Sequence, residues 1–123
     1  MVLVIDDDAD LRQYVRRRLS PLFTVVEASN ALDAMRTTED LTPNLILLDL
    51  GLPDMPGIEL IGQLRARPHL AAVPVLLMTG MAPADLGPAA VAESTGILSK
   101  PFDARGLLGR VRGALGLPSE TAP

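Results

Sequence analysis

Residues 45–57 read Leu45-Ile-Leu-Leu-Asp49-Leu-Gly-Leu-Pro-Asp-Met-Pro-Gly57, an apolar run that ends in a carboxylate and is followed by turn residues. Four consecutive apolar residues are typical of a strand that is covered on both faces, as in a parallel sheet flanked by helices. Asp49 then lies at the carboxyl end of that strand, where the ligand crevices of open parallel α/β sheets form. Because Asp is also common where strands turn into loops, Asp49 alone leaves open whether it caps a loop or serves a ligand.

The same alternation of strand and helix patterns runs along the whole chain. Apolar segments predict strands at residues 2–5, 23–26, 45–48, 73–78 and 96–98. Amphipathic patterns predict helices at residues 11–19, 31–38, 57–67, 88–94 and 104–115. Five strand–helix units in series predict an α/β fold: a doubly wound, flavodoxin-like (βα)5 parallel sheet of five strands in the order 2-1-3-4-5. We expect one domain over residues 1–117 and a tail or linker over residues 118–123.

Composition limits the classes of function. The chain of 123 residues is 48% hydrophobic but only 2% aromatic, so an aliphatic core is expected. Its formal charge of −4 provides no general attraction to nucleic acid or anionic lipid. The absence of cysteine excludes a disulfide framework and a thiolate metal site. No apolar run reaches the length of a membrane span, and Met1 leads directly into the first strand without a basic region, so a soluble, cytoplasmic protein is expected.

Chemically active side chains gather where the predicted strands end. With strands one and three as neighbours, Asp6, Asp7 and Asp49 converge in one crevice. At about 4 Å and an effective dielectric constant near 20, each pair of like charges repels by on the order of 4 kcal/mol, so positive charge is required. Mg²⁺ fits such oxygen ligands, and Lys100, the only lysine, follows the fifth strand. Thr79 adds a hydroxyl group at the end of the fourth strand.

This set of residues indicates phosphoryl transfer to a carboxylate. Asp49 would attack a phosphoryl group and become an acyl phosphate. Mg²⁺ and Lys100 would offset the charge of donor and product, while Thr79 and backbone amides hold the transferred oxygens.

Two other features are assigned no such role. The arginines of the first helix pattern lie mostly opposite its apolar stripe, so a solvated face is predicted for Arg12, Arg16, Arg17 and Arg18. His69, the only histidine, lies in a loop with no neighbouring Cys, Glu or second His, so we predict an ordinary surface residue.

As an ordered set, the motifs closely resemble the receiver domain of two-component response regulators. The resemblance covers residues 2–115 and rests on Val-Leu-Val-Ile-Asp6-Asp7-Asp8, Leu-Leu-Asp49-Leu-Gly-Leu-Pro-Asp-Met-Pro-Gly57, Met78-Thr79-Gly80 and Lys100-Pro101-Phe102. It implies that Asp49 accepts a phosphoryl group from a phosphohistidine on a sensor histidine kinase or a histidine phosphotransfer protein. It also implies a module that switches contacts with a downstream protein target or effector domain and catalyses only its own phosphorylation and dephosphorylation, with no direct contact to nucleic acid or membrane.

The resemblance also implies a ligand set. Asp7, Asp49 and the Gly51 carbonyl would bind Mg²⁺, and Asp6 would assist through water. The Lys100-Pro101 peptide would be cis. Asp8 is expected to serve the loop rather than the metal.

Two positions depart from the usual family pattern. Ile97 stands where family members carry an aromatic residue whose reorientation reports phosphorylation, so we expect residues 81–88 to carry the response instead. Gly51 and Met81 stand where family side chains tune loss of the phosphoryl group. Since neither side chain can orient a water molecule, slow self-dephosphorylation is predicted.

Three other readings stay open at this point. A phosphorylation-independent interaction module would keep the receiver fold, although all the expected site residues are present. A Mg²⁺-dependent aspartyl phosphatase usually needs a second acid close after the nucleophile, and none occurs before Asp54, across a proline. A flavodoxin-like cofactor protein is disfavoured because two Phe, one Tyr and no Trp leave little to stack on a flavin.

Overall fold

The strands form one parallel sheet in the order β2-β1-β3-β4-β5 in the computed structural model, which describes residues 1–81, 86–87 and 95–117. They are β1 (Val2–Ile5), β2 (Val25–Ala28), β3 (Leu45–Asp49), β4 (Val75–Thr79) and β5 (Gly96–Ser99). Every residue of β1, β3 and β4 is buried, because helices cover both faces of the sheet. The predicted strand order and parallel direction are confirmed.

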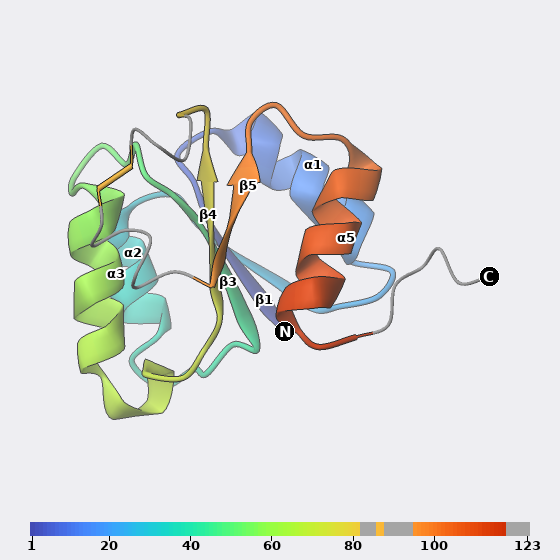
Figure 1. Ribbon diagram of the computed structural model, residues 1–123. Coiled ribbons are helices and arrows are strands. Elements are labelled where there is room, and N and C mark those ends of the chain that lie inside the picture. Colours follow the sequence, from blue (N-terminus) through green and yellow to red (C-terminus); the bar gives the residue numbers. More distant parts are fainter. Residues whose placement is uncertain (82–85, 88–94, 118–123) are drawn as a thin grey trace.

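Among the described residues, two pairs of helices cover the sheet, one pair on each face (Figure 1). They are α1 (Ala9–Leu19) with α5 (Ala104–Ala114), and α2 (Ala31–Thr37) with α3 (Gly57–Ala66), which leads into the short 3₁₀ helix η1 (Pro68–Leu70). Alternate strand residues face the two pairs: Val2 and Val4 pack under α1 and α5, and Leu3 and Ile5 under α2 and α3. No helix in the described ranges is long and apolar enough to cross a membrane.

Strand β2 begins two residues later than the predicted Phe23. At that point the backbone is still hydrogen-bonded to the C-terminal end of α1, because the amides of Leu22 and Phe23 both donate to the Leu19 carbonyl, at 2.9 and 2.8 Å. Phe23 packs its ring against the core beneath α1 and α5. The sheet register therefore starts at Val25, which lies opposite Val2.

Other boundaries differ by one or two residues. Strand β4 begins at Val75 rather than Val73, directly after Pro74, which has no N–H group to give to a neighbouring strand. Strand β5 continues to Ser99, and α5 ends at Ala114. The predicted helix over residues 88–94 and the predicted tail over residues 118–123 lie outside the described residues.

Two large apolar residues of the helices are exposed. Leu32 of α2 is 56% exposed and Ile58 of α3 is 41% exposed. In α2 the buried positions are Ala31 and Ala34, and Leu32 is turned about 100° from Ala31, away from the sheet. The fully buried positions of the short helix α2 are thus both alanines, and Met35 packs against the core beside them, partly buried.

Helix α2 is held at both ends by the segment that contains α3. Before α3, the Asp54 carboxylate accepts hydrogen bonds from the first two amides of α2, at 2.8 and 2.9 Å. After α3, Arg67 donates to the Met35 carbonyl at 2.6 Å, and His69 Nε2 lies 2.7 Å from the Thr38 carbonyl oxygen. His69 is an exposed residue, as predicted, with this one contact to the end of α2.

Candidate functional site

The parallel strands bring the predicted acidic residues together at their carboxyl ends. Asp6 directly follows β1 and Asp49 is the last residue of β3. One carboxylate oxygen from each of Asp6, Asp7 and Asp49 lies within 4.8 Å of the other two. Asp6 and Asp49 are buried, at 1% and 8% exposure, whereas Asp7 faces solvent. The cluster therefore has a buried floor and an open side.

Lys100 supplies positive charge to this cluster. Its Nζ donates to Asp6 Oδ2 at 3.0 Å and to Asp49 Oδ1 at 3.1 Å. The Lys100 backbone amide donates to the Thr79 carbonyl at 2.7 Å, which fixes the start of the side chain at the end of β4. The Lys100-Pro101 peptide is cis, as the sequence resemblance implied.

The environment keeps Lys100 charged and disfavours the ionised form of Asp6. Burial would lower the pKa of Lys100, but the hydrogen bonds and charges of Asp6 and Asp49 outweigh burial and raise it. Burial raises the pKa of Asp6, and the Asp49 charge adds to this. The Asp8 amide, which donates to Asp6 Oδ1 at 2.9 Å, and Lys100 oppose the rise without cancelling it.

The donor set fits a hard divalent cation. Three carboxylates face one ammonium group, so three negative charges against one positive leave two negative charges uncompensated among these four residues. The charge of Asp49 adds to the larger effect of burial in raising the pKa of Asp6, in keeping with this shortage of positive charge. Oxygen ligands on an open edge are those that Mg²⁺ binds while keeping several waters.

Thr79 and Gly51 lie at the same edge. Thr79 ends β4, is 4% exposed, and accepts a hydrogen bond from the Met81 amide at Oγ1, at 3.0 Å. A methyl group built at Gly51 would lie 3.8 Å from Asp49 Oδ2, so the Gly51 backbone adjoins that carboxylate. Thr79 thus ends the strand next to β3 at the same edge of the sheet, and the Gly51 backbone adjoins the Asp49 carboxylate.

Asp8 serves the loop, as expected. Its carboxylate caps α1 and accepts hydrogen bonds from the Asp10 and Leu11 amides at 3.0 and 3.3 Å. A side-chain oxygen at this position satisfies amides that have no partner within the helix. The cap sets where α1 begins, immediately after the acidic pair on the β1–α1 turn.

Gly57 allows the start of α3 to abut the end of β3. A methyl group on Gly57 would lie 2.6 Å from Leu50 Cα and 2.9 Å from the Asp49 carbonyl oxygen. The Gly57 amide donates to the Leu50 carbonyl at 3.0 Å across the same contact. This close approach closes the loop after β3 and holds the Asp49 backbone in place.

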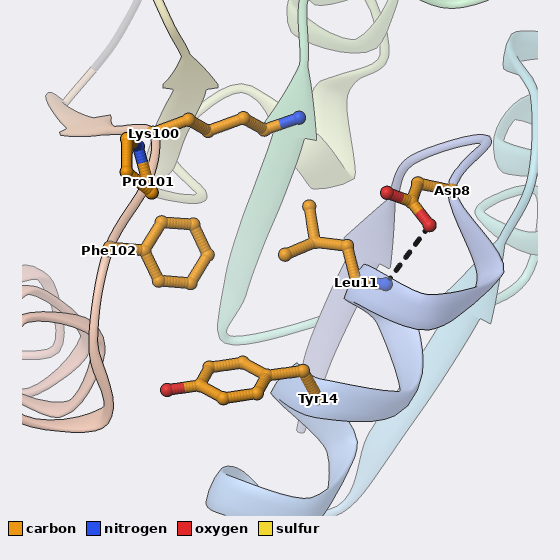
Figure 2. A pocket seen from close by; sticks show the side chains of 6 residues that line it. All are labelled: Asp8, Leu11, Tyr14, Lys100, Pro101 and Phe102. Carbon is orange, nitrogen blue, oxygen red and sulfur yellow. Dashed lines mark hydrogen bonds between the residues drawn. The ribbon is translucent and has the colours of Figure 1, made fainter.

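A pocket adjoins the acidic cluster on the side of α1. Its volume is about 440 Å³, and Lys100 belongs both to it and to the cluster (Figure 2). The rings of Tyr14 and Phe102 meet across it with centroids 6.3 Å apart and planes at 59°. The pocket is lined by Asp8, Leu11, Tyr14, Lys100, Pro101 and Phe102.

Sequence reasoning missed two contacts that support this edge. Arg12 is not solvated: its side chain is 17% exposed and donates to the Asp6 carbonyl and to Glu27. Asp54 caps α2, and the hydrogen bonds from the Ala31 and Leu32 amides hold the pKa of Asp54 below its usual value. The charge of each residue was visible in the sequence, but Glu27 lies 15 residues from Arg12 and Ala31 lies 23 residues from Asp54 in the chain.

Comparison with known proteins agrees with this geometry. The family model of the response regulator receiver domain matches residues 2–112. The transcriptional regulatory protein KdpE of Mycobacterium tuberculosis is 34% identical over 116 residues, which cover 94% of this chain and 50% of KdpE. The hybrid signal transduction histidine kinase D of Dictyostelium discoideum is 30% identical over 112 residues, or 90% of this chain and 7% of the kinase.

This chain thus spans half or less of the length of these two relatives. Among solved structures, the chemotaxis response regulator CheY4 of Vibrio cholerae superposes with a TM-score of 0.88 at 27% identity, over 93% of this chain and 97% of CheY4. The family match, the sheet order and the acidic pocket of Asp6, Asp7 and Asp49 lead to one assignment. The chain belongs to the response regulator receiver domain family.

Proposed function

We propose that Asp49 is the phosphoacceptor of this receiver domain and takes its phosphoryl group from a phosphohistidine on a sensor histidine kinase or a histidine phosphotransfer protein. The observation that carries the proposal is the position of Lys100, whose ammonium contacts both Asp6 and Asp49 at the mouth of the acidic cluster. A lysine that served only to neutralise one buried carboxylate would not need to lie between two of them.

In the reaction, one oxygen of the Asp49 carboxylate attacks the phosphorus atom as the bond to the histidine nitrogen breaks. The imidazole leaves with the electron pair of that bond, and Asp49 becomes an acyl phosphate. Lys100 can turn its ammonium from Asp49 to an oxygen of the new phosphoryl group, since its side chain is 28% exposed and retains freedom to move. The Thr79 hydroxyl, at the same strand edge, donates to another of these oxygens.

Mg²⁺ is the proposed cofactor. Asp7, Asp49 and the Gly51 carbonyl would hold the ion, and Asp6 would assist through water. When bound, Mg²⁺ supplies the two positive charges that the cluster lacks and offsets the charge of the incoming phosphoryl group. Asp7 is the exposed member of the cluster, so the ion has an open path from solvent.

The pocket beside Lys100 suits a protein phosphoryl donor. A partner that presents a phosphohistidine to Asp49 must cover the strand edge, and the apolar and aromatic groups of the pocket lie next to it. We infer that an apolar side chain of the partner enters there. The chain would act in the cytoplasm and relay the signal to a protein target or effector domain, without touching nucleic acid or membrane itself. It would catalyse no reaction beyond its own phosphorylation and dephosphorylation.

The test is the intact mass of the protein after incubation with Mg²⁺ and a small acyl phosphate. We expect one added phosphoryl group, which is lost in Asp49→Asn and in the presence of EDTA. Asp54→Asn is the matched control, because it neutralises another carboxylate of the same loop and should leave the adduct in place.

A protein with no adduct under any condition would contradict the proposal and favour a phosphorylation-independent interaction module. Continued turnover of a small phosphate ester would instead favour an aspartyl phosphatase.

A further inference from the structure

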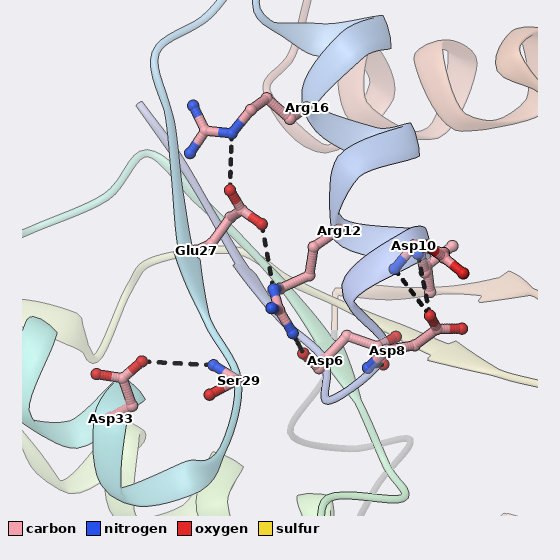
Figure 3. Close-up of polar contacts among 9 residues, drawn as sticks. Asp6, Asp8, Asp10, Arg12, Arg16, Glu27, Ser29 and Asp33 are labelled. Carbon is pink, nitrogen blue, oxygen red and sulfur yellow. Dashed lines mark hydrogen bonds and ion pairs between the residues drawn. The ribbon is translucent and has the colours of Figure 1, made fainter.

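An arginine of α1 contacts the backbone of the acidic turn. Arg12 Nη1 donates to the Asp6 carbonyl oxygen at 2.6 Å, and Arg12 Nε donates to Glu27 Oε1 at 3.1 Å (Figure 3). The Arg12 side chain is 17% exposed, so most of its surface is removed from water. One guanidinium group therefore joins the edge strand β2, helix α1 and the turn that carries Asp6 and Asp7.

Glu27 orients that guanidinium group. It lies on β2 opposite Val4 of β1, with its carboxylate shared between two arginines of α1. Arg16 Nε donates to Glu27 Oε2 at 2.7 Å, but Arg16 is 45% exposed, and within the described part of the chain it bonds to Glu27 alone. The two arginines thus share one acceptor, while Arg12 also reaches the Asp6 backbone.

The Asp6 carbonyl lies beyond the end of the regular sheet. The Asp6 amide still donates to the Ala28 carbonyl of β2 at 3.1 Å, but β1 itself ends at Ile5. Arg12 supplies a donor to this carbonyl oxygen. Because the peptide bond is planar, fixing this oxygen also fixes the plane that joins Asp6 to Asp7. The directions in which both carboxylates leave the backbone depend on that plane.

We propose that Arg12 is a positioning residue for the magnesium site, which it serves by holding the Asp6–Asp7 peptide while Glu27 holds the guanidinium group. This inference rests on the proposed function, because it assumes that the two carboxylates serve Mg²⁺. Arg12 would not touch the ion or the phosphoryl group. Its effect would be that of an outer-shell partner, whose loss typically weakens metal binding by about 10- to 100-fold.

A purely electrostatic role and a positioning role predict opposite effects of removing Arg12 on the affinity for Mg²⁺. A cation close to a metal site repels the metal, so removing the charge of Arg12 would tighten Mg²⁺ binding if charge alone mattered. Removing a group that aligns two carboxylates would weaken binding instead. The sign of the change in Mg²⁺ affinity therefore separates a positioning role from a general electrostatic one.

The experiment compares Mg²⁺ dissociation constants of the wild type, Arg12→Gln, Arg12→Lys and Arg16→Gln, from amide chemical shifts during a titration with MgCl₂. Arg16→Gln is the matched control, because it removes the same charge from the same helix and breaks an ion pair with the same Glu27. We expect binding to be weaker by about tenfold in Arg12→Gln and nearly unchanged in Arg16→Gln. Arg12→Lys keeps the charge but lacks the planar fork that reaches two acceptors, so weaker binding is expected there as well.

Thermal melts accompany the titration. Arg16→Gln loses only a partly exposed ion pair and should melt close to the wild type. Arg12→Gln also loses the hydrogen bond to the Asp6 carbonyl and should melt slightly lower. If Arg12→Gln is poorly folded, Arg12→Lys gives the answer at unchanged charge. Folded Arg12 variants that bind Mg²⁺ as the wild type does, or more tightly, would overturn the inference alone. A wild-type protein that binds no Mg²⁺ would overturn it together with the proposed magnesium site.

Discussion

Replacing Gly57 with alanine should destabilise the protein and disturb Asp49 at the same time. The added methyl group would lie 2.6 Å from Leu50 Cα and 2.9 Å from the Asp49 carbonyl oxygen. Both are backbone atoms, so no change of rotamer can relieve the contact, and either the end of β3 or the start of α3 must move. Overpacking of this kind costs about 1–3 kcal/mol, which corresponds to a fall in Tm of roughly 5–15 °C for a domain of this size.

Gly62→Ala is the matched control on the same helix. A methyl group at Gly62 meets no atom within 4 Å, and the residue is exposed. Alanine is there a better helix former than glycine and also restricts the unfolded chain, so a gain of up to about 1 kcal/mol is expected. The free energy of unfolding can be measured for both variants by urea denaturation with far-ultraviolet circular dichroism.

The same displacement should slow phosphorylation of Gly57→Ala, because the clash falls on the carbonyl of the phosphoacceptor residue itself. The rate of adduct formation with a small acyl phosphate, measured below the melting temperature, tests this. A Gly57→Ala protein that is as stable as the wild type and is phosphorylated at the same rate would show that the close approach at Gly57 does not hold Asp49 in place.

Three further outcomes are expected. Asp54→Ala should lower Tm at neutral pH, and the difference from the wild type should shrink as the pH falls below 3.8, because the pKa of Asp54 is lowered from that usual value. The ionised carboxylate therefore stabilises the fold above 3.8, and this contribution is lost as the pH falls through the folded-state pKa. A Tm difference that does not change with pH would argue against the cap. Gly51→Asn should speed loss of the phosphoryl group, since a side-chain amide there can orient a water molecule. The measurement is the decay of the mass adduct over time, and a variant that decays as slowly as the wild type, or more slowly, would exclude this role. Lys100→Met removes the cation that Asp6 and Asp49 share, so phosphoryl uptake should fall by on the order of 100-fold while Mg²⁺ binds more tightly, and unaltered uptake would contradict the role given to Lys100.

The meeting of the acidic residues was predictable because local patterns identify the strands, and the usual order of a doubly wound sheet makes β1 and β3 neighbours. The apolar run before Asp49 is too continuous for a half-exposed strand, and residues 2–5 show the same pattern before Asp6. Parallel strands then place both carboxylates at one edge whatever the details of the loops. Lys100 was identifiable because it is the only lysine and follows the brief apolar segment of residues 96–98.

The contacts that support the site were not predictable, because they join segments that are distant in the chain. A cluster of arginines on a helix gives no local sign that Arg12 turns towards Glu27 and the Asp6 carbonyl, whereas Arg16 stays largely in water. In the sequence, Asp54 looks like an ordinary turn residue. Its carboxylate oxygens nevertheless accept hydrogen bonds from the Leu32 and Ala31 amides of α2, which lie 22 and 23 residues earlier in the chain. The exposure of Leu32 likewise depends on which face of α2 meets the sheet, and the sequence of this short helix does not specify that face.

The hydrogen bonds at both ends of α2 have a consequence for the order of folding. With 7 residues, α2 is far shorter than the roughly 12–15 residues that an isolated helix needs to persist in water. Its first amides depend on Asp54 and its last carbonyls on Arg67 and His69, which flank α3. Helix α2 can therefore form only once α3 has docked on the sheet, and it must be lost whenever α3 detaches. The amides of α2 and α3 should accordingly exchange with solvent at one common free energy of opening, as a single cooperative unit.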